Sequence, residues 1–110
     1  MDVDISIVVP VYNEQENVEA VYSGIRSALQ NMNFSFEIIM VDDGSSDGSY
    51  RLLLGLTSED ASLKVIRFRR NFGQTAAMAA GFDYAKGNII IPMDGDLQND
   101  PADIPRLIEK

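Results

Sequence analysis

Short runs of apolar, β-branched residues alternate along this chain with segments in which apolar residues recur at helical spacing. Four runs predict strands at residues 5–12, 36–43, 63–68 and 88–93. The first, second and fourth are too apolar to face water and predict buried strands. The segments between them predict helices near residues 18–32, 50–56 and 71–87. Strands that alternate with helices are typical of βαβ units. The expected fold class is therefore α/β, with a doubly wound, mostly parallel sheet and a Rossmann-like nucleotide-binding half.

Capping residues sharpen the ends of two predicted helices. Asn13 can cap the first helix, and Glu16 three residues later can complete a capping-box-like pair. Asp100 and Pro101 have the residue types of a cap and a first helical position, which predicts a fourth helix near the end of the chain. The chain stops inside that helical pattern. We therefore expect that it is truncated at its C-terminus.

Composition excludes several classes of protein. The 110 residues contain no Cys and no His, so thiolate chemistry and Ser-His catalysis are excluded, and a metal would need oxygen ligands. The formal net charge of -8 argues against a nucleic-acid partner, which needs a basic surface. No apolar run approaches the ~20 residues of a transmembrane segment. The N-terminus lacks a secretory pattern, so a cytoplasmic setting is expected.

Acidic residues follow three of the four predicted strands. Glu14 follows the first strand, Asp42 and Asp43 end the second, and Asp94 and Asp96 follow the fourth. Ligands of doubly wound sheets bind at the carboxyl ends of the strands, so these carboxylates should gather at one rim. Like charges that close repel each other unless solvent or a cation separates them.

Each acidic motif also has a plain structural explanation. The "DGD" at residues 94–96 suits a solvated turn as well as a divalent cation, with Gln98 as a further oxygen ligand or merely a residue at a helix start. The "VDDGSSDGS" segment at residues 41–49 suits turns and a helix cap, or a carboxylate that accepts hydrogen bonds from a nucleobase. Arg69 and Arg70 suit a phosphate-facing corner or an ordinary surface. The sequence contains neither G-x-G-x-x-G nor a P-loop motif.

Taken together, four blocks resemble the N-terminal half of family-2 glycosyltransferases, and most closely the polyprenyl-phosphate sugar transferases of the dolichol-phosphate mannosyltransferase and bactoprenol glucosyltransferase type. The blocks are VVPVYNEQENV, EIIMVDDGSSDGS, RNFGQTAAMAAGFDYAKGNIIIPMDGDLQNDP and IPRLIEK. The resemblance begins near Ile5 and runs to the end of the chain. It implies a GT-A fold and makes residues 1–110 the nucleotide-sugar-binding part of a catalytic domain.

The resemblance also implies a reaction and a set of site residues. The reaction is an inverting transfer of a hexose from a nucleotide-diphosphate sugar, of the GDP-mannose or UDP-glucose type, to a polyprenyl phosphate. The full-length protein would work at the cytoplasmic face of a membrane. By position, three groups of residues would serve the donor: Pro10, Tyr12 and Glu14 at the nucleoside; Val41, Asp42 and Asp43 at the base; Asp94, Gly95, Asp96 and Gln98 at Mg²⁺ or Mn²⁺ and the donor, with Asp94 and Asp96 catalytic.

Two other classes compete with this interpretation. A receiver-type signalling domain phosphorylated on Asp has about this size and carries acidic residues at strand ends, but its acidic pair follows the first strand. A haloacid-dehalogenase-like phosphatase also places a D-x-D after an apolar strand, but usually with Thr or Val after it, where this chain has Leu97. Because a GT-A domain is about twice this length, we expect the 110 residues alone to bind donor weakly and to turn over little.

Overall fold

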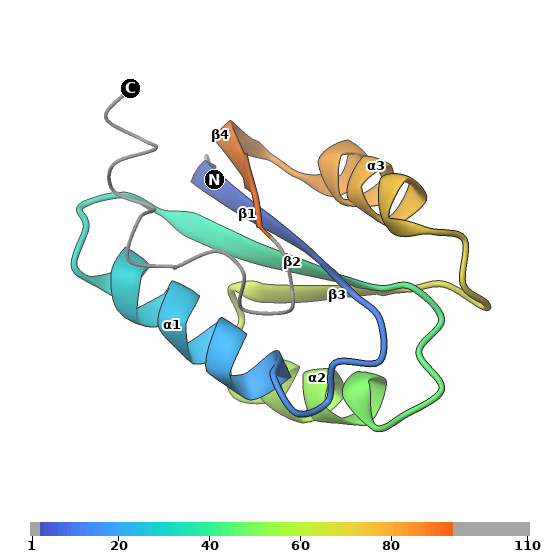
Figure 1. Cartoon of the computed structure of the whole chain (residues 1–110). Helices are drawn as coiled ribbons and strands as arrows, with labels where there is room; N and C mark the ends of the chain where they lie inside the picture. Colours follow the sequence, from blue (N-terminus) through green and yellow to red (C-terminus); the bar gives the residue numbers. More distant parts are fainter. Residues whose placement is uncertain (1–2, 94–110) are drawn as a thin grey trace.

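A computed structural model describes residues 3–93 and shows a four-stranded parallel sheet with helices on both faces (Figure 1). The strands are β1 (Val3–Val11), β2 (Phe36–Asp42), β3 (Leu63–Arg67) and β4 (Gly87–Pro92). The helices are α1 (Val18–Gln30), α2 (Ser49–Thr57) and α3 (Gln74–Tyr84). The four strands and three helices expected in this part of the chain are confirmed, with ends that differ by a few residues. The helix expected from Asp100 lies outside the described residues.

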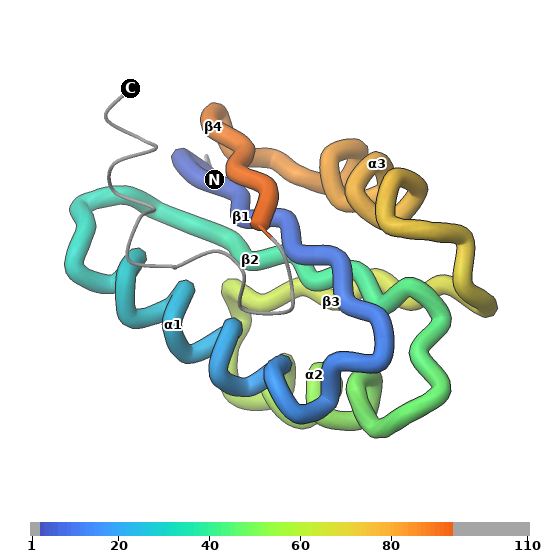
Figure 2. Tube along the Cα trace, in the orientation of Figure 1, coloured from blue at the N-terminus to red at the C-terminus, as the bar shows by residue number. Residues whose placement is uncertain are grey.

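The strand order is β3-β2-β1-β4, with every pairing parallel. The central strand β1 pairs along its length with both neighbours, so that Val8 lies opposite Ile39 on one side and Pro92 on the other. Parallel pairing places the carboxyl ends of the strands at a common edge. Figure 2 shows the loops that leave β1, β2 and β3 gathered at that end of the sheet, which we call the rim.

Two apolar layers hold the sheet between its helices. The larger layer lies on the face covered by α1 and α2, where Val21, Ile25 and Leu29 of α1 pack with Ile5, Ile7 and Met40 of the sheet. The spacing of these helical residues puts them on one side of α1, which is why the periodicity predicted the helix.

Helix α3 covers the opposite face through small side chains. Ala77 is fully buried against Val8, Ile39 and Val41. A Cβ added at Gly81 would overlap Val8, so α3 approaches β1 more closely than a larger residue would allow. Small residues thus make α3 a closely packed cover of this face.

Strand β4 differs from its prediction as a buried strand. Ile89 and Ile90 are about two-fifths exposed, whereas Ile91 is buried. Within residues 3–93, β4 pairs with β1 alone and stands at the edge of the sheet, and α3 packs mainly on β1 and β2. The apolar character of a strand does not reveal whether its neighbours are present.

Candidate functional site at the rim of the sheet

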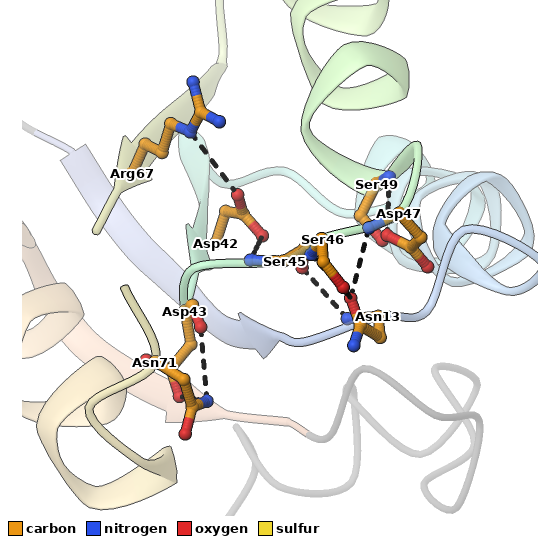
Figure 3. A network of polar contacts seen from close by, with 9 residues as sticks. All are labelled: Asn13, Asp42, Asp43, Ser45, Ser46, Asp47, Ser49, Arg67 and Asn71. Carbon is orange, nitrogen blue, oxygen red and sulfur yellow. Dashed lines mark hydrogen bonds and ion pairs between the residues drawn. The ribbon is translucent and has the colours of Figure 1, made fainter. Parts of the chain in front are cut away.

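The loops after β1 and β2 are joined by reciprocal hydrogen bonds. The side-chain oxygen of Asn13 accepts from the backbone N–H of Ser46 at 2.8 Å and of Asp47 at 3.3 Å, while the N–H of Asn13 donates to Ser45 Oγ at 2.9 Å (Figure 3). One residue further, the N–H of Glu14 donates to the buried hydroxyl of Ser49. The two loops therefore form one rigid unit at the rim.

This arrangement corrects the predicted role of Asn13. It does not cap α1, because its side chain faces the neighbouring loop and its φ of 51° places it in the left-handed region, which Asn tolerates. The first turn of α1 is instead closed by the carbonyl of Glu14, which accepts from the N–H groups of Asn17 and Val18. The short amide of Asn suits both tasks, so the sequence did not distinguish them.

Asp43 connects the loop after β2 to the loop after β3. Its Oδ1 accepts from the N–H of Phe72 at 2.7 Å, and its Oδ2 accepts from the N–H of Gly73 at 3.0 Å and from Asn71 Nδ2 at 2.9 Å. Gly44 brings the same loops into backbone contact, because a Cβ at this position would overlap Arg70 and Asn71. The segment at residues 71–73 thus rests on the end of β2 and leads directly into α3.

Asp42 is fully buried and incompletely bonded. Its Oδ1 accepts from the N–H of Ser45 at 3.3 Å, but within the described part of the chain its Oδ2 has no hydrogen-bond donor. Arg67 Nε lies 4.0 Å from Oδ2, and the guanidinium lies over the ring of Tyr50. A buried carboxylate oxygen without a donor costs free energy, and such groups are concentrated at functional sites.

The remaining predicted nucleoside residues lie at the ends of β1 and β2. Tyr12 is nearly half exposed and directly follows β1, so its ring is available to a ligand. The carboxylate of Glu14 accepts from Asn17 Nδ2 at 2.8 Å. Pro10 pairs with Val41 in the sheet, and the side chain of Val41 is buried beneath α3. Contact between Val41 and a ligand would therefore involve its backbone.

The predicted metal and donor residues, Asp94, Gly95, Asp96 and Gln98, lie outside the described residues. Within residues 3–93 there is no group of three or more acidic side chains that could hold a metal ion. The same residues include no helix with the length and apolarity needed to cross a bilayer. Prediction of the cation site therefore rests on the sequence.

Two residues of the rim were not singled out as a site by the sequence. Arg67 ends β3 beside Asp42, and Asn71 donates to both the carboxylate and the backbone carbonyl of Asp43. Neither has a local signal, because an Arg at a strand end and an Asn in a loop are common at surfaces. Their partners lie more than twenty residues away in the sequence, and only the parallel sheet brings them together.

A family model covers nearly the whole of this chain. Residues 6–110 match the model described as "Glycosyl transferase family 2". The chain belongs to glycosyl transferase family 2. Its topology agrees with the GT-A fold of that family, and the receiver and phosphatase alternatives find no support.

Curated relatives are similar over almost all of this chain but are much longer. An undecaprenyl-phosphate 4-deoxy-4-formamido-L-arabinose transferase of Pseudomonas fluorescens is 46% identical over 107 residues, which are 96% of this chain and 31% of that protein. A dodecaprenyl-phosphate galacturonate synthase of Rhizobium johnstonii is 43% identical over 97% of this chain and 32% of its own length. The chain thus spans about a third of these relatives, and it resembles the polyprenyl-phosphate type within the family.

Solved structures support the fold at lower identity. The glucosyl-3-phosphoglycerate synthase of Mycobacterium tuberculosis, crystallised with Mn²⁺, UDP and phosphoglyceric acid, superposes with a TM-score of 0.76 at 22% identity over 97% of this chain and 38% of that chain. A mannosyltransferase of Pyrobaculum calidifontis, solved with GDP-Man and Mn²⁺, gives 0.73 at 21% identity over 87% of this chain and 28% of that one. At these identities the likeness establishes the fold alone.

Proposed function

We propose that this chain is the nucleotide-sugar-binding part of an inverting glycosyltransferase. The whole protein would transfer a hexose from a nucleotide-diphosphate sugar, of the GDP-mannose or UDP-glucose type, to a polyprenyl phosphate. The observation that carries this proposal is the rim, at the end of a parallel sheet where such folds bind ligands. Tyr12 and Glu14 follow β1, Asp42 and Asp43 stand at the end of β2, and the loops after these strands are hydrogen-bonded into one unit. Membership of the family supplies the reaction class.

Different residues of the rim would contact the base and the ribose of a nucleoside. Tyr12 offers an exposed ring for stacking on a base, and Glu14 offers a carboxylate near a ribose hydroxyl. Asp42 and Asp43 offer oxygen acceptors for the base, and a carboxylate accepts only from a base that carries an N–H at the facing position. Uracil and guanine carry an N–H on the ring nitrogen of their Watson–Crick edge, whereas that ring nitrogen is an acceptor in cytosine and adenine, which donate there only through their exocyclic amino group. We therefore expect the site to favour UDP and GDP over CDP and ADP.

The oxygen ligands that the sequence places after β4 suit a divalent cation. Asp94 and Asp96 provide hard oxygen ligands, with Gln98 as a third, and this is the ligand type that Mg²⁺ and Mn²⁺ prefer. A net charge of -8 would repel a diphosphate. When bound, such a cation would neutralise the pyrophosphate and stabilise the leaving diphosphate. Relatives of known structure contain Mn²⁺ together with a nucleotide.

The acceptor side of the proposal follows from the chemistry of a lipid phosphate. Its oxygen is already anionic at neutral pH, so attack on the sugar needs no strong base, which is compatible with a chain that lacks His. The names of the curated relatives include undecaprenyl and dodecaprenyl phosphate. The full-length protein would then act at the cytoplasmic surface of a membrane, where polyprenyl phosphate and sugar nucleotide can meet.

Calorimetric titration of UDP, GDP, CDP and ADP, with and without Mn²⁺, tests the proposal. UDP or GDP should bind, and Mn²⁺ should tighten binding at least about tenfold, or roughly 1.4 kcal/mol. Asp96→Ala should remove the effect of Mn²⁺. Asp83→Ala, on the exposed surface of α3, is the matched control for loss of one negative charge. Binding that is equally tight in excess chelator, or unchanged by Asp96→Ala, would contradict the role of the cation.

A further inference from the structure

Asn71 is the polar side chain that ties the loop before α3 to the proposed base-binding carboxylate. Its residue is exposed as a whole, yet its amide nitrogen lies 2.9 Å from Oδ2 of Asp43 and 3.2 Å from the carbonyl oxygen of the same residue. Asp43 itself is 3% exposed. The amide nitrogen of this exposed asparagine therefore donates to one buried residue, and Figure 3 shows Asn71 beside Asp43.

The chemistry of this contact requires a primary amide or a similar donor. A carboxylate has about four lone-pair positions. The N–H groups of Phe72 and Gly73 and the amide of Asn71 occupy three of them, two on Oδ2 and one on Oδ1. Within residues 3–93, one position on Oδ1 is left for a further donor. Because all three donors come from residues 71–73, this segment fixes both the direction of the carboxylate and the lone pair that remains.

The backbone around this contact has little freedom to compensate. Gly44 follows Asp43 with a φ of 71°, and a Cβ there would lie 2.6 Å from the carbonyl oxygen of Arg70. The loop is thus seated directly on the chain that carries Asp43. A substitution at Asn71 should therefore change the orientation of the Asp43 carboxylate, because the closely packed backbone cannot shift to compensate.

We propose that Asn71 is a positioning residue for nucleotide binding, which acts by holding the Asp43 carboxylate in the orientation that receives the N–H of the base. This inference rests on the proposed function and deepens it. Asn71 need not touch the nucleotide. It determines how well the Asp43 carboxylate is oriented toward the base. A side chain without an N–H donor at position 71 should therefore weaken nucleotide binding, even though Asp43 itself is still present.

Asn71→Ala and Asn71→Asp distinguish positioning from simple structural support. Asn71→Ala removes one of three donors and should weaken UDP or GDP binding about tenfold, measured by calorimetry at constant Mg²⁺ well below the melting temperature. Asn31→Ala is the matched control, because that amide donates to the Ser27 carbonyl at the far end of α1 and should leave affinity unchanged.

Asn71→Asp adds a readout that a purely structural role would not move. Near pH 5 one of the two facing carboxyl groups can hold a proton and donate to the other, so affinity should approach that of the unsubstituted chain. Near pH 8 both are ionised and repel, and affinity should fall at least about tenfold. Among the described residues, the other charged groups at the end of β2 and in the two loops are Asp42, Asp47, Arg69 and Arg70, and they are common to both proteins. At each pH, the affinity of the variant is divided by the affinity of the unsubstituted chain. This ratio cancels the effect of nucleotide titration, which is the same for both proteins.

The outcomes separate this inference from the proposed function. A pH-dependent loss in Asn71→Asp, together with weaker binding in Asn71→Ala, would support it. Affinities within twofold of the Asn31→Ala control at every pH would overturn the inference alone. Failure of the unsubstituted chain to bind any nucleotide would overturn the proposed function and this inference with it.

Discussion

The two ends of the sheet both bury carboxylates, but they bond them differently. At the end opposite the rim, Glu37 Oε2 accepts from Ser6 Oγ at 2.6 Å and from the N–H of Lys86 at 2.7 Å. Asp60 there accepts from Ser62, from Arg26 at 2.8 Å and from the hydroxyl of Tyr22. These bonds join β2 to β1 and to the residue before β4, and the loop before β3 to α1.

At the rim, the donors to Asp42 and Asp43 come from loops. Asp43 is held by residues 71–73, and Asp42 keeps one oxygen without a hydrogen bond within the described residues. Three of the donors to Glu37 and Asp60 lie in regular elements, Ser6 in β1 and Tyr22 and Arg26 in α1, so these bonds contribute to stability. A buried carboxylate oxygen without a donor is compatible with a ligand site. The carboxylates at both ends are buried, so the two ends differ mainly in which residues donate hydrogen bonds to those carboxylates.

The largest effect is expected from closing the space between the rim loops. Gly44→Ala forces a side chain with positive φ against the backbone of Arg70 and should lower the free energy of unfolding by about 3 kcal/mol. Gly55→Ala is the control, because nothing lies within 4 Å of its Cβ and a helical Gly→Ala change should raise stability by about 0.5–1 kcal/mol. Urea denaturation measures both. Equal stability of the two variants would show that the loops are not in firm contact.

An intermediate effect should separate the carboxylates at the two ends. Glu37→Gln keeps the shape but loses the charge that strengthens two hydrogen bonds, so stability should fall by about 1–2 kcal/mol. Asp42→Asn keeps the acceptor for Ser45 and replaces the buried oxygen that has no donor within residues 3–93. Its stability should change by less than about 0.5 kcal/mol or rise, while nucleotide affinity falls. A larger loss from Asp42→Asn than from Glu37→Gln would reverse the comparison.

The smallest effect is expected from acid titration of Asp60. Burial acts to raise the pKa of this carboxyl, but the hydrogen bonds from Ser62 and Tyr22 and the charge of Arg26 outweigh it, so the pKa lies below its ordinary value. A lowered pKa in the folded state gives stability that is present above the unfolded value of about 3.9 and is lost as the pH falls through the folded value. Arg26 is partly exposed, which screens the pair, so the contribution should stay below about 1 kcal/mol.

Thermal melting between about pH 6 and pH 2.5 measures this dependence. The melting temperature of Asp60→Asn should fall less on acidification than that of the unsubstituted chain, because the variant has no proton to take up at this position. Parallel acid profiles for the two proteins would show that the pKa of Asp60 does not differ between the folded and unfolded states.

Much of the fold was predictable because it depends on local patterns. The buried strands are continuous apolar runs, and α1 places Val21, Ile25 and Leu29 on one face, so periodicity located them. The prediction for Asn13 was wrong because a capping residue and an inter-loop residue have the same chemistry. The prediction for β4 as a buried strand was wrong for Ile89 and Ile90, because burial of an edge depends on what stands beside it.

The sequence by itself determined the class of fold, the gathering of acidic residues at the strand ends and the family to which the chain belongs, since each is written in residue order and spacing. Only the tertiary structure decided how those carboxylates are bonded: that Asn13 joins two loops, that Asn71 holds Asp43, and that Asp42 has, among the described residues, no donor for the oxygen beside Arg67. The physical reason is that hydrogen bonds depend on direction and on distances of about 3 Å. Residues twenty-five or more positions apart acquire such geometry only when a parallel sheet brings their loops to the same edge.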